Sequence, residues 1–124
     1  MSLVKSHHPI KHLKSFKYAF SGILHSLYHE ANFRVQVVLT ILATALGFYF
    51  QIAEAEWGVM ILAFASLLSA EVLNTSIENF IDFLIPKKSE VVRIVKDLAA
   101  GFVLINAIAC AFILVIIFSK HILK

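Results

Sequence analysis

The stretch that most constrains this chain is residues 71–82, where an apolar helix runs into carboxylates. The apolar segment Trp57–Ala70 continues without a break into Glu-Val-Leu-Asn-Thr-Ser-Ile-Glu-Asn-Phe-Ile-Asp. An ionised side chain near the middle of a membrane helix costs about 2.5–3.5 kcal/mol on insertion scales. A helix that needed only to span a membrane would not carry Glu71 at that depth, so this residue requires an explanation beyond anchoring.

Three further polar residues follow Glu71 at helical spacing. With 3.6 residues per turn, Glu71, Asn74, Glu78 and Asp82 share one stripe of the helix surface. A helix end emerging into water accounts for Asp82 and can account for Glu78, but it leaves Glu71 unexplained. We therefore interpret this acidic stripe as functional.

The composition places the stripe in a membrane protein. The chain has 124 residues, enough for one domain, and 60% of them are hydrophobic while 15% are charged. This mixture is too apolar for a water-soluble domain of this size. Residues 1–20 contain no unbroken apolar core, so we do not expect a cleaved signal peptide. The single cysteine, Cys110, lies in an apolar run and is expected to act as a small buried hydrophobe.

The N-terminal part is expected to lie at the membrane surface. Residues 1–10 are predicted to form a solvated tail, whose adjacent His7 and His8 are not expected to bind metal. In residues 11–31 apolar side chains recur in steps of three and four, and the lysines lie mostly off the apolar face. This pattern predicts an amphipathic helix, which could rest on lipid, on protein or on both. His25 and His29 have the spacing of a metal pair, but no further soft ligand is near them, so we interpret them as interfacial polar residues.

Three membrane-spanning helices are expected, over residues 34–53, 57–84 and 98–119. Val35–Ala53 is uncharged over 19 residues and Leu98–Ser119 over 22, and Pro86 separates the second helix from the third. The predicted fold is an all-α integral membrane protein in which residues 1–124 form one domain. It consists of three transmembrane helices and an N-terminal amphipathic surface helix.

The distribution of positive charge predicts the orientation. Five Lys or Arg residues precede the first span, none lies between spans one and two, and four lie between spans two and three. The positive-inside rule then puts the N-terminus and the 85–97 loop in the cytoplasm and the C-terminus outside, although two C-terminal lysines oppose this. The polar residues that would gather at the cytoplasmic membrane surface are Glu30, Glu78, Asp82, Lys87, Lys88, Lys96 and Asp97.

These residue types favour chemistry on a phosphate group. Carboxylates in oxygen-only surroundings suit Mg²⁺, which is commonly shared with substrate phosphates, and neighbouring lysines suit the phosphates themselves. Together they suggest a nucleoside triphosphate bound through a metal ion, although none of the four glycines is in a Walker setting. A carboxylate held as deep as Glu71 could take a proton from an alcohol, and an alcohol at that depth would be a lipid.

Two other function classes compete with this interpretation. A small non-catalytic oligomeric membrane protein could use Glu71, Asn74 and Glu78 only for helix association. Helix association alone does not require Glu30 and the Lys96-Asp97 pair to lie on the same side of the membrane as Glu78. An ion pathway is the other alternative, but Trp57–Ala70 offers almost no polar group to continue it. Neither a nucleic acid nor a protein partner is predicted.

Three motifs in this chain resemble those of one family. Glu-Val-Leu-Asn-Thr-Ser-Ile-Glu at 71–78 resembles the signature of the prokaryotic diacylglycerol kinases, a family that includes the Gram-positive undecaprenol kinases. Lys-Asp-Leu-Ala-Ala-Gly at 96–101 and Glu-Ala-Asn-Phe-Arg at 30–34 are similar to two further motifs of the family. The resemblance covers nearly the whole chain from about Lys11.

The resemblance implies a Mg-ATP-dependent lipid kinase of the bacterial cytoplasmic membrane. It also implies a homotrimer whose sites lie between neighbouring subunits, with the amphipathic helix closing each site from the cytoplasmic side. Carried over by position, Glu71 is similar to the catalytic base. The metal carboxylates are Glu30 and Glu78. The implied nucleotide-binding residues are Lys11, Tyr18, Asn74, Lys87, Lys88, Ser89, Lys96 and Asp97. The implied substrate-binding residues are Ser15, Phe16, Arg34, Glu71 and Ala100.

Some positions depart from the family's motifs, and others bear on which lipid is the substrate. Lys11 stands where some members have Arg, which keeps the charge but loses the bidentate fork. Lys87-Lys88-Ser89 lies where the family contacts the ATP phosphates, with residues that differ from those expected. Trp57, Asn32-Phe33 and the Ala-Ala-Gly at 99–101 look more like the undecaprenol kinase branch. We therefore favour undecaprenol as substrate, with diacylglycerol as the alternative.

Overall fold

The computed structural model describes residues 9–124, which fold into four α-helices without a strand in that range. The helices are α1 (Pro9–His29), α2 (Ala31–Phe50), α3 (Glu54–Leu84) and α4 (Glu90–Ile122). Three of them, α2, α3 and α4, are long and apolar enough to cross a membrane. The predicted all-α membrane fold with three spans is therefore confirmed, while His7 and His8 lie outside the described residues.

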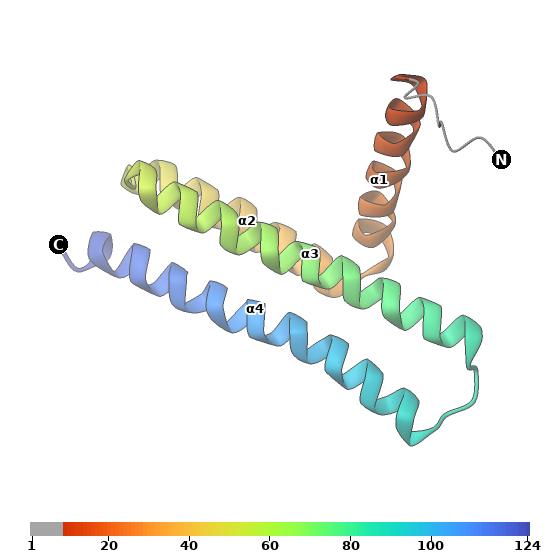
Figure 1. The fold of residues 1–124 in the computed structure, drawn as a ribbon. Helices are drawn as coiled ribbons and strands as arrows, with labels where there is room; N and C mark the ends of the chain where they lie inside the picture. The colour runs from red at the N-terminus through yellow and green to blue at the C-terminus, as the bar shows by residue number, and fades with distance from the viewer. Residues whose placement is uncertain (1–8) are drawn as a thin grey trace.

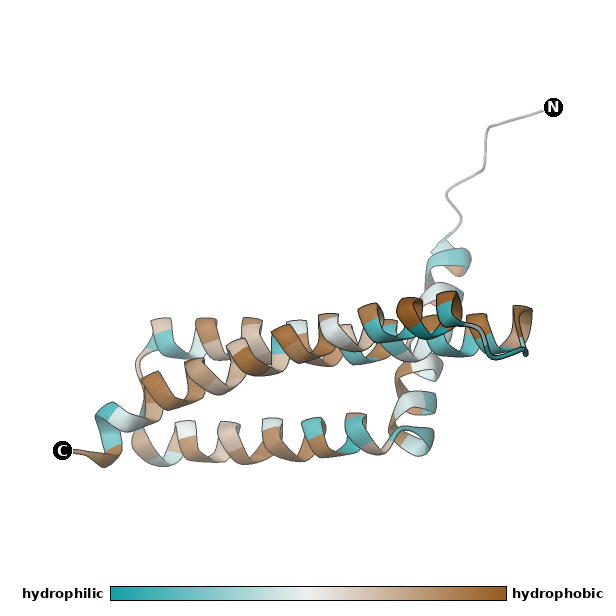
Figure 2. Ribbon diagram, turned by 90° about the horizontal axis from the view of Figure 1, so that it is seen from below, coloured by the Kyte–Doolittle hydropathy of each residue, from teal (hydrophilic) through white to brown (hydrophobic). Residues whose placement is uncertain are grey.

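The helices α2, α3 and α4 run side by side, and α1 leaves them at a steep angle (Figure 1). The longest packing interface joins α3 to α4, and α1 contacts α2 and α3 through the end at which it meets α2. Figure 1 shows the last turns of α3 and the first turns of α4 beyond the point at which α1 leaves the bundle, and Figure 2 shows the end of α3 extending past α1 as well. This projection separates the α3–α4 loop from the apolar body of the bundle.

The helix ends differ from the expected spans in ways that local chemistry explains. The first helix already includes Pro9 and Ile10, which precede the expected start at residue 11, because proline is well accommodated in the first turn of a helix. The last helix begins at Glu90 rather than at 98, because the Ser89 hydroxyl accepts a hydrogen bond from the Val92 amide at 3.2 Å and caps it. Charged residues before the third span are thus helical rather than part of a loop.

A single extended residue, Glu30, separates α1 from α2. Its backbone angles are φ −109° and ψ 110°, outside the helical region. The Arg34 guanidinium Nη1 donates to the backbone carbonyls of Leu27 at 3.1 Å and Tyr28 at 2.8 Å. These carbonyls belong to the last turn of α1, where helical carbonyls have no partner within their own helix. Arg34 therefore fixes the corner at which Glu30 is presented.

At the opposite end of the bundle, α2 turns tightly into α3. Gln51 adopts a left-handed conformation at φ 52°, and the Ile52 amide donates to the Gly47 carbonyl at 3.1 Å. The Glu56 carboxylate then accepts from the Ala53 amide at 2.9 Å and caps α3. The Trp57 ring lies against Gly47, so a larger residue at this position would meet the indole.

Most large apolar side chains point outward rather than into a core. The buried cluster is small and is made by α2, α3 and α4 around Met60, Phe64, Cys110 and Phe118. Hydrophobic residues cover the three long helices, whereas hydrophilic residues gather at the α3–α4 loop and on parts of α1 (Figure 2). A surface of this kind is stable in lipid, where exposed apolar side chains lose nothing by facing acyl chains.

We expect Gly47→Ala to destabilise the protein by about 1–2 kcal/mol. A Cβ at this position would lie 2.7 Å from the Trp57 ring, and such overpacking outweighs the better helix propensity of alanine. The matched control is Gly58→Ala, because a Cβ there meets nothing within 4 Å. Unfolding titrations in detergent micelles measure both variants, and equal stabilities would contradict the close α2–α3 approach.

Candidate active site

The acidic stripe on α3 changes from buried to exposed along its length. Glu71 is 3% exposed and Asn74 is 9% exposed, whereas Glu78 is half-buried and Asp82 is exposed. The change follows from the fold, because the last turns of α3 extend beyond α1 and α2 (Figure 1). The stripe therefore connects the interior of the bundle with its projecting polar end.

Glu71 lies between α3 and α2 and is held there by an amide. The Gln36 side chain on α2 donates from Nε2 to the Glu71 Oε2 at 3.1 Å, with both residues buried. Asn32, one turn earlier on α2, also interacts with this carboxylate through its side chain. The charges of Glu30 and Glu78 act on Glu71 as well. The structure thus brings the three predicted acids Glu30, Glu71 and Glu78 into one electrostatic neighbourhood.

Oxygen atoms dominate this neighbourhood. The Asn74 Nδ2 donates to the Glu78 Oε1 at 3.4 Å. The Asn74 Oδ1 and the Thr75 Oγ1 are buried and have no hydrogen-bond partner among residues 9–124. Carboxylate and amide oxygens are the ligands that Mg²⁺ accepts, so the donor set fits this ion. Within residues 9–124, no three His, Cys, Asp or Glu side chains converge on one metal position. An ion here would therefore use water or substrate oxygens to complete its coordination.

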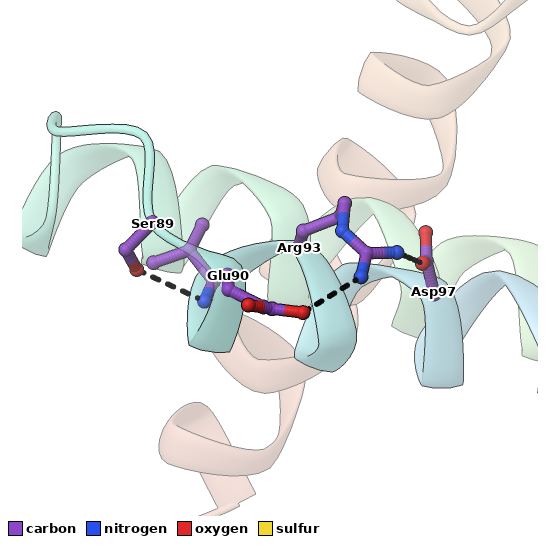
Figure 3. Close-up of polar contacts among 5 residues, drawn as sticks. Ser89, Glu90, Arg93 and Asp97 are labelled. Atoms are coloured by element: carbon purple, nitrogen blue, oxygen red, sulfur yellow. Dashed lines mark hydrogen bonds and ion pairs between the residues drawn. The ribbon is translucent and has the colours of Figure 1, made fainter.

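A second polar cluster lies on the first turns of α4 (Figure 3). The Arg93 guanidinium is placed between two acids, with Nη1 at 3.0 Å from the Asp97 Oδ2 and Nη2 at 3.5 Å from the Glu90 Oε1. All three side chains are largely exposed. The spacing of three and four residues puts them on one face of the helix, which is why they pair.

This cluster and residues of the α3–α4 loop line an open hollow of about 480 Å³. Four residues predicted to bind nucleotide line it together: Lys88, Ser89, Lys96 and Asp97. Lys96 also forms an ion pair with Asp82 on α3. Since Asp82 belongs to the acidic stripe, this ion pair links the hollow to the exposed end of that stripe.

An apolar groove lies on another side of the stripe, where α1, α2 and α3 meet. It has a volume of about 400 Å³. Its lining comes from Ile23, Phe33, Leu68, Ser69, Val72, Leu73 and Ser76. Val72 directly follows Glu71 in the chain, so the groove passes beside the turn of α3 that carries the buried carboxylate. Its dimensions and apolar lining suit a hydrocarbon chain.

Other predicted site residues stand apart from these clusters within the described chain. Lys11, Ser15, Phe16 and Tyr18 lie on the first half of α1 and are exposed, Tyr18 by 70%. The Ser15 hydroxyl donates to the Lys11 carbonyl at 3.0 Å. Lys87 and Ala100 are also exposed. The roles of these residues stay predictions, and Arg34, predicted to bind substrate, uses its guanidinium on the carbonyls of α1.

The structure adds two residues that were not predicted as part of the site. In the sequence, Gln36 shares a mildly polar stripe with Thr40 and Thr44 at a spacing of four, which suits helix packing, but nothing in a single helix shows which partner helix it faces. Arg93 is, from the sequence, one of the four positive charges between spans two and three. Its spacing of four residues from Asp97 was a usable signal, since such pairs face each other on a helix.

Comparison with known proteins agrees with the motifs described above. The family model for prokaryotic diacylglycerol kinase matches residues 17–118. The undecaprenol kinase of Bacillus subtilis is 31% identical over 105 residues, which cover 85% of each chain. A diacylglycerol kinase of Helicobacter pylori (strain J99) is 31% identical over 100 residues, covering 81% of this chain and 78% of that protein.

A diacylglycerol kinase of Synechocystis is 28% identical over 102 residues. The match covers 82% of this chain but only 58% of the Synechocystis protein. The family match includes α2, α3, nearly all of α4 and most of α1, and therefore every element that carries the acidic stripe, the hollow and the groove. The chain belongs to the prokaryotic diacylglycerol kinase family.

Proposed function

We propose that this protein transfers the γ-phosphoryl group of ATP to the hydroxyl group of a membrane lipid. The observation that carries the proposal is the position of Glu71, a carboxylate buried in a helix that is apolar enough to span a membrane and lying beside an apolar groove. The polar hollow at the α3–α4 loop lies further along the same helix pair. Family membership supports a lipid kinase, and relatives of both named kinds match over most of this chain.

Glu71 is proposed to accept the proton of the lipid hydroxyl. The apolar groove would hold the hydrocarbon chain, so that the hydroxyl group lies at the polar end near the stripe. Positioning and neutralisation of charge account for most of the catalysis in phosphoryl transfer. Burial of Glu71 between α2 and α3 excludes water from the base, which favours transfer to the lipid over hydrolysis of ATP.

The hollow on α4 is proposed to bind the nucleotide phosphates. Lys88, Arg93 and Lys96 supply positive charge around it. Arg93 and Lys96 already pair with carboxylates, but exposed ion pairs of this kind contribute only about 0–1 kcal/mol. Phosphate oxygens can therefore replace those carboxylates at little cost.

Mg²⁺ is proposed as the metal cofactor, with Glu30, Glu78 and the amide oxygen of Asn74 as the residues that would hold it. When bound, the ion would neutralise charge on the phosphate oxygens. The support in this chain is the oxygen-only donor set and the buried, unpartnered Asn74 Oδ1.

Undecaprenol is proposed as the preferred lipid, with diacylglycerol as the alternative. The preference comes from Trp57, Asn32-Phe33 and Ala99–Gly101, which look like the undecaprenol kinase branch. Overall sequence identity does not distinguish between the two lipid substrates, because the undecaprenol kinase of Bacillus and the diacylglycerol kinase of Helicobacter are both 31% identical to this chain. The groove is apolar along most of its lining, which either lipid can use.

A homotrimer with sites between subunits is proposed for the assembly. Lys11, Ser15, Phe16 and Tyr18 lie exposed on α1, where a neighbouring subunit could bring its own acidic stripe. A single chain also leaves long apolar faces uncovered on α2 and α4. The proposed location is the bacterial cytoplasmic membrane, with the N-terminus and the site in the cytoplasm.

We expect purified protein in mixed micelles to transfer radiolabel from ATP to undecaprenol, and more slowly to diacylglycerol. Glu71→Gln should lower kcat by about 10²–10⁴-fold, since general base catalysis contributes that much, while nucleotide affinity and oligomer size stay unchanged. Glu54→Gln is the matched control, an exposed acid on the first turn of the same helix.

The same assay distinguishes the non-catalytic alternative. If folded, oligomeric protein transfers phosphate to neither lipid, the result would favour a membrane protein that uses Glu71, Asn74 and Glu78 only for helix association. Full activity of Glu71→Gln on either lipid would remove this residue as the base.

Glu78→Gln is expected to raise the Mg²⁺ concentration for half-maximal activity by about 10–100-fold, because it replaces a ligand carboxylate by an amide. Activity should recover in part at high Mg²⁺. The measurement is a magnesium titration at saturating ATP, with Glu54→Gln again as the control. An unchanged magnesium dependence would count against a metal-binding role for Glu78.

The proposed orientation predicts which cysteines a membrane-impermeant maleimide reaches. In a Cys110→Ala background, a cysteine at Ser89 should be labelled only after the cell is opened, and one at Gln51 should be labelled in intact spheroplasts. Ser89 precedes α4 in the polar loop and Gln51 lies in the α2–α3 turn at the other end of the bundle. The reverse pattern would place the site outside the cell.

A further inference from the structure

We infer that Gln36 is a positioning residue for the base of the phosphoryl transfer, an inference that rests on the proposed function. The amide of Gln36 on α2 donates to the Glu71 Oε2 on α3 at 3.1 Å. The two residues are 35 positions apart and come from different helices. Asn32, one turn earlier on α2, also interacts with the Glu71 carboxylate through its side chain, so α2 engages this acid from two successive turns.

The orientation of the amide follows from what Glu71 can accept. An ionised carboxylate only accepts hydrogen bonds, so the Gln36 Nε2 must face it; the flipped amide would put two acceptor oxygens together. The Gln36 Oε1 is then directed away from Glu71, and it is buried without a partner in the described chain. Gln36 thus leaves one of its own polar atoms unsatisfied while it holds the carboxylate.

The bond is shielded and directional. Gln36 is 9% exposed and Glu71 is 3% exposed, so little water competes for the amide. A hydrogen bond to an ionised group is about twice as strong as a neutral one. It restricts the side-chain torsions of Glu71, whose remaining acceptor positions can then face a hydroxyl from the groove beside Val72.

The backbone that carries Gln36 is also fixed. The Thr40 hydroxyl donates to the Gln36 carbonyl at 2.7 Å, and the Thr44 hydroxyl donates to the Thr40 carbonyl at 2.7 Å. Both threonines bond within their own helix, and only Gln36 of the three reaches α3 by a hydrogen bond. The same face of α2 therefore provides both the test position and its control.

The experiment compares Gln36→Met, Gln36→His and Thr44→Val in the mixed-micelle assay. Methionine keeps the length of the side chain but removes the donor, and histidine offers a ring N–H at a similar reach from Cβ. We expect Gln36→Met to lower kcat by roughly 10–100-fold with KM for lipid and ATP within about twofold, because a misplaced reacting group costs rate rather than affinity. Gln36→His should recover part of kcat, and Thr44→Val should match the wild type.

A second readout does not depend on activity. The infrared carboxylate band of Glu71, identified as the difference from Glu71→Gln, should shift in Gln36→Met and stay unchanged in Thr44→Val. A kcat of Gln36→Met equal to that of the wild type, or an unshifted band, would overturn the inference. Loss of kcat without recovery in Gln36→His would indicate a packing role and would overturn it as well.

The two readouts separate this inference from the proposed function. If the wild type phosphorylates no lipid alcohol, the proposed function fails, and the band still reports whether Gln36 holds Glu71. If the wild type is active and the band of Gln36→Met is unshifted, only the positioning role fails.

Discussion

The burial of one carboxylate between two membrane helices is the constraint on which this structure depends. A charged group in that position is costly unless it is hydrogen-bonded, and α2 supplies the amide of Gln36 to Glu71 at 3.1 Å. This bond requires α2 and α3 to pair in one register. The tight turn at Gln51 and the contact of Trp57 with Gly47 set that register from the other end of the bundle.

The corner at Glu30 connects this buried bond to the surface. Because the chain leaves the helical conformation for one residue, α1 departs steeply while α2 continues into the bundle (Figure 1). The Arg34 guanidinium secures the corner on the last carbonyls of α1. Glu30 therefore comes close enough for its charge to act on Glu71, and the apolar groove opens between the same three helices. The position of Glu30 and the steep departure of α1 thus follow from one break in the helical conformation.

The end of the bundle that projects beyond α1 serves a different purpose. It carries the loop and the first turns of α4, where Arg93 and Lys96 are paired with exposed acids around an open hollow. Such pairs are weak in water, so under the proposed function phosphate oxygens would replace them. The gradient of burial from Glu71 to Asp82 joins this polar end to the buried carboxylate. The proposed reaction between a water-soluble nucleotide and a lipid alcohol needs such a connection.

Sequence by itself determined the helical membrane fold, the three spans and the acidic stripe, because hydrophobic length and 3.6-residue spacing are local properties of one helix. The motifs at 30–34, 71–78 and 96–101 also determined the family. Only the tertiary structure decided that Gln36 faces Glu71 and that Arg34 holds the end of α1. Both depend on how separate helices pack, which no spacing within one helix encodes. The start of α4 at Glu90 is instead a local property, set by the capping Ser89, although hydropathy alone does not show it.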